Sequence, residues 1–150
     1  MSNDNVVMPG RLAKGRVELF HKKCIEKCRS KKTFDEGFLV DKSHIAKGIL
    51  KNPKRSALTN EDIAAVIQQG ILHYETCTYS YPIEIVVKGI IKDFEWTDLS
   101  SRKIATYIED KVEVKVVIRE RRPRDIIVTA YITDMGAKIS TNKEISREIW

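Results

Sequence analysis

The sequence predicts an α+β domain in which N-terminal helices pack on a C-terminal antiparallel β-sheet. Apolar residues recur at helical spacing in the first half of the chain, and apolar and polar residues alternate with the period of a strand in the second half. Because the helices come first and the strands follow, this order favours an α+β class. The 150 residues, 42% of them hydrophobic, suffice for one domain with a single buried core.

An amphipathic, basic helix is expected from Leu12 to Cys28, where Lys and Arg stand between the apolar positions. Residues 1–10 before it are expected to form a disordered lead-in, and residues 11–150 are expected to form one domain. Ser30 to Gly37 is expected to be a polar break after the helix.

Two further helices are expected before the strands. A short helix over residues 41–50 would place His44 and Lys47, three residues apart, on one face. The clearest helix begins at Thr59, which is followed three residues later by Asp62 in the pattern of a capping box, and it stops at Gly70.

The second half of the chain predicts strands. Residues 83–91 are rich in β-branched side chains, residues 94–101 are expected to be a loop or turn, and residues 102–109 are ambiguous between helix and strand. Residues 112–119 alternate cleanly between apolar and other side chains, and a basic turn over residues 120–124 joins them to the next strand in a hairpin.

That last strand contains the run Asp125 to Tyr131. Residues two apart on a strand point to the same face. The strand's inward-facing residues are therefore expected to be Ile126, Val128, Ala130 and Ile132. The opposite face would carry the hydroxyl groups of Thr129, Tyr131 and Thr133.

The chain is basic, with 27 Lys and Arg against 21 Asp and Glu and a net charge of +6. Such a balance favours a polyanionic partner. The apolar stretches are too short to span a bilayer, and the first residues lack the pattern of a signal peptide, so a cytosolic site of action is expected.

The three cysteines do not form an even disulfide framework. Cys24 and Cys28 stand four apart and would share a helix face, and a zinc site would need Cys77 with His21 or His73 as well. The spacing of a zinc ribbon is absent, so buried or reduced thiols are the favoured interpretation and no metal or cofactor is expected.

Three segments in this order resemble the barnase–EndoU–colicin–RelE superfamily of ribonuclease toxins. They are Ser43-His44-Ile45, Leu58-Thr59-Asn60-Glu61-Asp62-Ile63 and Ile127-Val128-Thr129-Ala130-Tyr131. The similarity is greatest to the C-terminal toxin domains of contact-dependent or polymorphic bacterial toxins. It implies metal-independent cleavage of RNA, often tRNA, in a target cell.

Cleavage of RNA without a metal requires an acid, a base and positive charge at the phosphate. His44 titrates near neutrality and suits the acid or base role. Thr129 would hold a phosphate oxygen, and Tyr131 would donate a proton, orient the phosphate or stack on a base. Lys47 and Arg119 would supply positive charge.

Other basic residues are expected to grip the RNA backbone. They are Lys54, Arg55, Arg121, Arg122 and Arg124. The expected partners are RNA, tRNA in particular, and an acidic immunity or antitoxin protein suited to the basic surface. The expected location is the cytoplasm of the cell in which the protein acts, either as a free protein or after delivery as the C-terminal part of a secreted toxin.

Two alternatives remain open. A metal-dependent nuclease would use Glu113-Val114-Lys115 on a strand with Asp93 or Glu95 as an upstream carboxylate. A non-catalytic nucleic-acid- or protein-binding module would use the basic helix and the basic hairpin turn to hold its partner.

Overall fold

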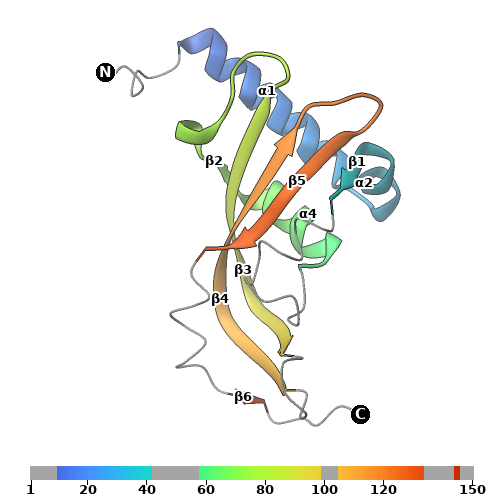
Figure 1. Cartoon of the computed structure of the whole chain (residues 1–150), viewed down its shortest axis with the longest axis vertical. Helices are drawn as coiled ribbons and strands as arrows, with labels where there is room; N and C mark the ends of the chain where they lie inside the picture. Colours follow the sequence, from blue (N-terminus) through green and yellow to red (C-terminus); the bar gives the residue numbers. More distant parts are fainter. Residues whose placement is uncertain (1–9, 42–57, 99–104, 134–143, 146–150) are drawn as a thin grey trace.

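Helices α1 (Arg11–Lys27) and α4 (Asn60–Gln69) lie on one face of a β-sheet, so the predicted α+β class is confirmed (Figure 1). The computed structural model describes residues 10–41, 58–98, 105–133 and 144–145. None of the helices in these ranges is both long enough and apolar enough to cross a membrane.

Within the described residues the sheet has six strands. They are β1 (Phe38–Val40), β2 (Ile71–Leu72), β3 (Glu84–Asp98), β4 (Ala105–Arg119), β5 (Asp125–Ile132) and β6 (Glu144–Ile145). The strand order is β1-β5-β4-β3-β2, and β6 pairs with β4.

The C-terminal strands pair antiparallel as predicted, and the N-terminal strand β1, which was not predicted, makes the sheet mixed. β1 pairs with β5 in parallel, while β2–β3, β3–β4 and β4–β5 are antiparallel. A parallel pair needs a long crossover, and here the chain between β1 and β5 passes through α4, β3 and β4. β1 has only three residues, too few for its pairing to be recognised from a local pattern.

Helix α2 (Lys31–Gly37) occupies the segment expected to be a polar break, so that prediction is wrong. Ser30 and Thr33 form a capping box, in which the Thr33 N–H donates to the Ser30 hydroxyl at 3.2 Å. Phe34 then buries its ring beside Phe38, with the ring centroids 5.0 Å apart. One buried aromatic residue and a cap are enough to order a turn of helix that is otherwise polar.

Helix α4 begins as predicted, because the Thr59 hydroxyl accepts from the Asp62 N–H at 3.1 Å and the Asp62 carboxylate accepts from the Thr59 N–H at 3.0 Å. Gly70 ends the helix as predicted, but it does not adopt the left-handed backbone conformation that is common for glycine at a helix C-terminus. Its backbone is extended, and a Cβ added there would lie 2.5 Å from both the Val66 carbonyl oxygen and a Val87 methyl group. Gly70 therefore permits close packing of α4 against β3.

β3 and β4 form a long hairpin that runs from the pair Glu84–Arg119 to the pair Asp98–Ala105. The loop expected at residues 94–101 is therefore wrong for residues 94–98. Phe94 and Trp96 alternate with charged residues and are buried, and this continues the period of the strand.

β5 contains a β-bulge that breaks its alternation. Val117 pairs with Thr129 and the next residue, Ile118, pairs with Ile127, so Val128 has no partner on β4. Ala130 and Ile132 are buried as predicted. Ile126 and Val128 are not, because the extra residue reverses the faces before it, and Ile127 enters the core instead.

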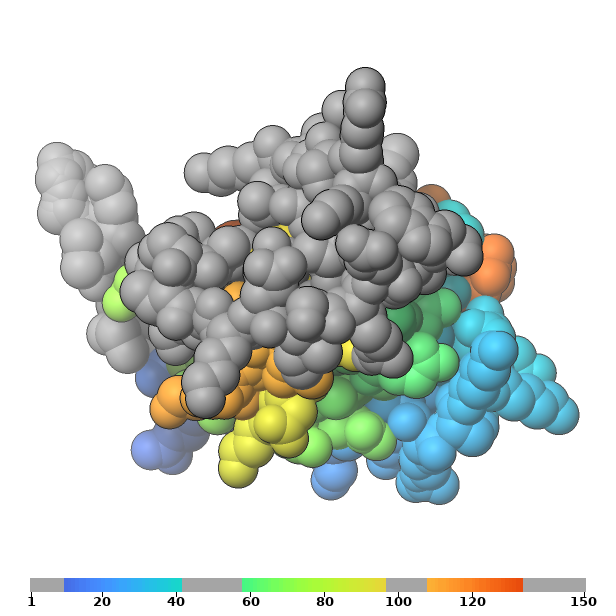
Figure 2. All heavy atoms as spheres, turned by 90° about the horizontal axis from the view of Figure 1, so that it is seen from below, coloured from blue at the N-terminus to red at the C-terminus, as the bar shows by residue number. Residues whose placement is uncertain are grey.

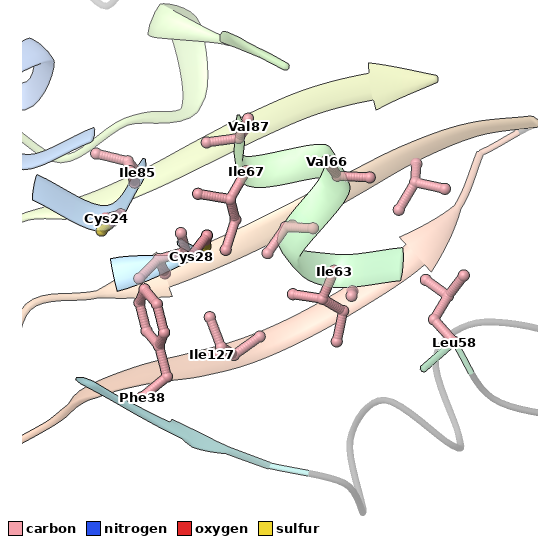
Figure 3. Packing of buried hydrophobic residues seen from close by; sticks show 14 of the residues in the cluster. Cys24, Cys28, Phe38, Leu58, Ile63, Val66, Ile67, Ile85, Val87 and Ile127 are labelled. Atoms are coloured by element: carbon pink, nitrogen blue, oxygen red, sulfur yellow. The ribbon is translucent and has the colours of Figure 1, made fainter. Parts of the chain in front are cut away.

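The core lies between α1, α4 and one face of the sheet (Figure 3). Ile63, Val66 and Ile67 of α4 and Cys24 of α1 are fully buried there, together with Ile127 of β5. The space-filling view shows α4 (green) between the N-terminal helices (blue) and β3 (yellow) (Figure 2). The face of the sheet opposite this helical layer carries the polar side chains described in the next section.

Candidate functional site

Four predicted site residues lie outside the described part of the chain: His44, Lys47, Lys54 and Arg55. The structure describes the other six, which lie on β4, on β5 and in the turn between them: Arg119, Arg121, Arg122, Arg124, Thr129 and Tyr131. They fall into two regions, one on the sheet and one beside α1.

The sheet face turned away from α1 and α4 carries polar side chains on three strands. We call this set the polar face: Glu84, Lys88, Glu113, Lys115, Arg119, Thr129 and Tyr131. Tyr131 pairs with Lys115 on β4, which pairs with Lys88 on β3. Side chains directly opposite each other are separated by about 5 Å at Cβ, so these three form one row.

The neighbouring rows hold the other predicted residues. Thr129 is opposite Val117 one row from Tyr131, about 7 Å along the strand. Arg119 is in the row after that, opposite Ile126. The structure therefore brings Arg119, Thr129 and Tyr131 onto one face, and the bulge at Val128 is what aligns them.

Arg119 is held by a carboxylate. Its Nε donates to Glu84 Oε2 at 2.9 Å, and its Nη2 lies 2.8 Å from the same oxygen. The Arg119 side chain is 48% exposed, so this pair is of the surface kind that contributes little to stability. A phosphate that offers two oxygens to the guanidinium group can compete with such a pair.

Lys88 is also paired, with its Nζ 3.7 Å from Glu113 Oε2. Glu113 accepts a second contact, a hydrogen bond of 2.7 Å from the Thr133 hydroxyl. Lys115 stands between Lys88 and Tyr131 and has no ion pair among the described residues. Lys115 was not among the residues predicted for this site. Lys115 precedes Val117 by two residues and Arg119 by four, so the three share one face of β4. The strand register is what then places Lys115 beside Tyr131.

The carboxylates expected for a metal-dependent nuclease do not come together. Glu113 pairs with Ile90, whereas Asp93 and Glu95 lie farther along β3, with Glu95 opposite Ile108. Within the described ranges, no three His, Cys, Asp or Glu side chains are close enough to share a metal ion.

The cysteines are thiols, and Cys24 and Cys28 are buried in the core as predicted. Burial raises the pKa of the Cys28 thiol to about 11, and burial together with the charge of Asp125 raises the pKa of the Cys24 thiol. Cys77 donates to the His73 carbonyl at 3.4 Å, and His21 Nε2 lies 2.9 Å from the Ile67 carbonyl oxygen. These groups already have partners within the fold.

The second region is a hollow of about 280 Å³ lined by residues of α1, of the segment leading into β3, and of the turn that joins β4 and β5. We call it the basic hollow, and its lining residues are Arg16, Leu19, Phe20, Lys23, Tyr81, Ile83, Glu120 and Arg122. Arg16 and Lys23 stand seven residues apart, two turns of α1, and so share one face of the helix. The hollow therefore brings together the basic helix and the basic hairpin turn, the two segments expected to hold the partner of a non-catalytic binding module.

A partly buried ion pair joins the turn to α1. Asp125, 5% exposed, contacts Lys27 Nζ of α1, and its other carboxylate oxygen accepts from the Arg121 N–H at 3.0 Å. Arg124 points to α2 instead, where it donates to the Asp35 carbonyl oxygen at 3.4 Å. Of the three arginines of the turn, Arg122 is the one that lines the hollow.

No protein-family model, no curated protein and no solved structure matches the chain.

Proposed function

We propose that this protein binds RNA and cleaves it without a metal ion, with the scissile phosphate held on the polar face. The observation that carries the proposal is the arrangement of hydroxyl groups and cations in adjacent rows of β3, β4 and β5. Arg119 and Lys115 are four residues apart on β4, about 13 Å, and the row of Thr129 lies between them. A phosphodiester group on Thr129 would thus have a cation on either side.

Each residue has a role that its chemistry allows. Thr129 donates a hydrogen bond to a non-bridging phosphate oxygen, and Tyr131 donates a proton to the leaving oxygen or orients the phosphate. Arg119 and Lys115 stabilise the extra negative charge that develops on phosphorus. The 2′-hydroxyl attacks phosphorus as a base takes its proton, and the bond from phosphorus to the 5′-oxygen breaks as an acid protonates that oxygen. His44 is the base or the acid, and this role requires its imidazole to be within reach of the phosphate held by Thr129.

The resemblance to ribonuclease toxins supplies the rest of the proposal. The substrate would be tRNA or another RNA in the cytoplasm of the cell in which the protein acts. The partner would be an acidic immunity or antitoxin protein, which the net charge of +6 suits electrostatically.

The test compares the wild type with His44→Ala, Tyr131→Phe and Lys32→Ala on purified tRNA and total RNA. Lys32 is an exposed lysine of α2, and Lys32→Ala serves as a control outside the polar face. We expect the wild type and Lys32→Ala to cleave RNA and to arrest growth when expressed, and the His44→Ala and Tyr131→Phe variants to cleave RNA far more slowly and to leave growth unaffected. A wild type that leaves RNA intact and cells unharmed would contradict the proposal.

The basic hollow favours a second candidate function, a non-catalytic module that binds nucleic acid. Its three cations and exposed tyrosine need no acid or base to hold RNA. Tight binding of RNA by a wild type that never cleaves it would support this candidate over the first.

A further inference from the structure

The basic hollow presents three cations that pair with no carboxylate in the described part of the chain. Arg16, Lys23 and Arg122 are exposed and form no ion pair among the described residues, and Glu120 is the one carboxylate in the lining. This differs from the polar face, where Glu84 holds Arg119. Cations that are not neutralised within the fold attract a polyanion more strongly.

The hollow also presents apolar and aromatic surface. Tyr81 is 68% exposed and Leu19 is 54% exposed, and Phe20 and Ile83 lie buried at the floor. An exposed tyrosine ring beside cations matches the two parts of a nucleotide, because a base stacks on an aromatic face while arginine and lysine hold the phosphates.

The shape and surroundings favour a single strand over a duplex. In a duplex the faces of the bases are already stacked on their neighbours, so the Tyr81 ring would have no base to contact. A hollow of about 280 Å³ is near the lower limit of small-ligand sites, which suits one nucleotide.

The hollow and the polar face meet at one end of the sheet. Glu120 and Ile83 line the hollow, and the residues next to them, Arg119 and Glu84, form the first row of the polar face. A strand that leaves the hollow around Glu120 would therefore reach Arg119 next.

We infer that the basic hollow is a subsite for one unpaired nucleotide of a single-stranded RNA, in which Tyr81 stacks on the base and Arg16, Lys23 and Arg122 hold the adjoining phosphates. The identity of the strand as RNA rests on the proposed function. The subsite lies next to the polar face and makes unpaired segments the substrate class.

The experiment measures binding of a fluorescein-labelled 2′-O-methyl RNA of about ten nucleotides by anisotropy, as a single strand and as a duplex with its complement. The 2′-O-methyl groups block attack on the phosphate, so binding is measured without cleavage. We expect Tyr81→Ala to weaken binding of the single strand about 10-fold, and Tyr81→Trp to restore it. The wild type should bind the single strand more tightly than the duplex.

The three cations are tested through the salt dependence. Each of Arg16→Ala, Lys23→Ala and Arg122→Ala should lower the slope of log Kd against log salt by about 0.7. Two exposed residues outside the hollow give matched controls, Lys32→Ala for charge and Ile71→Ala for apolar surface, and both should bind as the wild type does.

Three results would overturn the inference: unchanged binding by Tyr81→Ala, equal affinity for the duplex, or poly-L-glutamate bound as tightly as the RNA, which would identify an acidic protein as the occupant. The outcome is separable from the proposed function. A wild type that shows the expected binding but leaves unmodified RNA intact retains the subsite and removes the cleavage proposal. If the wild type cleaves RNA and Tyr81→Ala binds the single strand as tightly as the wild type does, the cleavage proposal is retained and the subsite is removed.

Discussion

The polar face and the basic hollow meet at the β4–β5 turn but hold their charges differently. On the polar face, Arg119 and Lys88 each have a carboxylate on the neighbouring strand. In the hollow, Arg16, Lys23 and Arg122 have none among the described residues. A paired cation such as Arg119 is fixed in direction and suits a site that must position one phosphate, where Lys115 is the cation with no ion pair among the described residues. Three such cations together, as in the hollow, suit the attraction and binding of a polyanion.

The largest expected effect separates these two roles. Tyr131→Phe removes one hydroxyl from the polar face and should lower kcat for RNA cleavage about 100-fold while Kd stays near the wild-type value, because acid–base groups act on the transition state. Rapid-quench kinetics with tRNA measure the first quantity and anisotropy the second. Tyr81→Phe, which keeps the aromatic ring of the hollow, is the control and should change neither. If Tyr131→Phe weakened RNA binding by the same factor by which it lowered kcat, the polar face would bind RNA without contributing to catalysis.

A second prediction concerns the joint between α1 and the turn. Asp125→Ala leaves Lys27 and the Arg121 N–H without their acceptor and should lower the free energy of unfolding by about 2–3 kcal/mol. The value is below that of a fully buried pair because the Lys27 side chain is 33% exposed. Urea denaturation measures it, with Asp35→Ala, which removes an exposed carboxylate of α2, as the control. Unchanged stability would show that the turn is held without this pair.

A smaller effect is expected from the pair on the polar face. Glu84→Gln releases Arg119 and should tighten RNA binding about threefold at low salt, with the gain disappearing at high salt, since exposed pairs are worth up to about 1 kcal/mol and are screened. Lys115→Gln should weaken binding by a similar factor. An anisotropy titration at two salt concentrations measures both. Weaker binding by Glu84→Gln would show that Glu84 orients Arg119 for RNA rather than competing with it.

The smallest expected effect comes from metal removal. Because the polar face supplies its own cations, the cleavage rate should be the same in excess EDTA as in magnesium buffer. The measurement is the initial rate on one labelled RNA under both conditions. Loss of cleavage on chelation, with recovery on adding magnesium, would favour the metal-dependent alternative that uses Glu113.

Local patterns in the sequence predicted the elements that depend on neighbouring residues. The capping box of Thr59 and Asp62 and the alternation of residues 112–119 both involve side chains within a few positions of each other. The α2 helix was not predicted because its capping box, formed by Ser30 and Thr33, has threonine at the third helical position, where Glu or Gln is usual. Ile126 and Val128 were assigned to the core because alternation carries no mark of a bulge, which depends on the partner strand.

The sequence by itself determined the α+β class, the basic charge, and the pairing of Thr129 and Tyr131 on one face of a strand. Tertiary structure decided which side chains those hydroxyl groups would meet. Lys115 and Arg119 come beside them through the β4–β5 register, and Arg122 meets Arg16 and Lys23 because Asp125 and Lys27 hold the turn against α1. Periodicity records which way a side chain points, whereas its neighbour across a sheet or a turn depends on contacts between residues far apart in the chain.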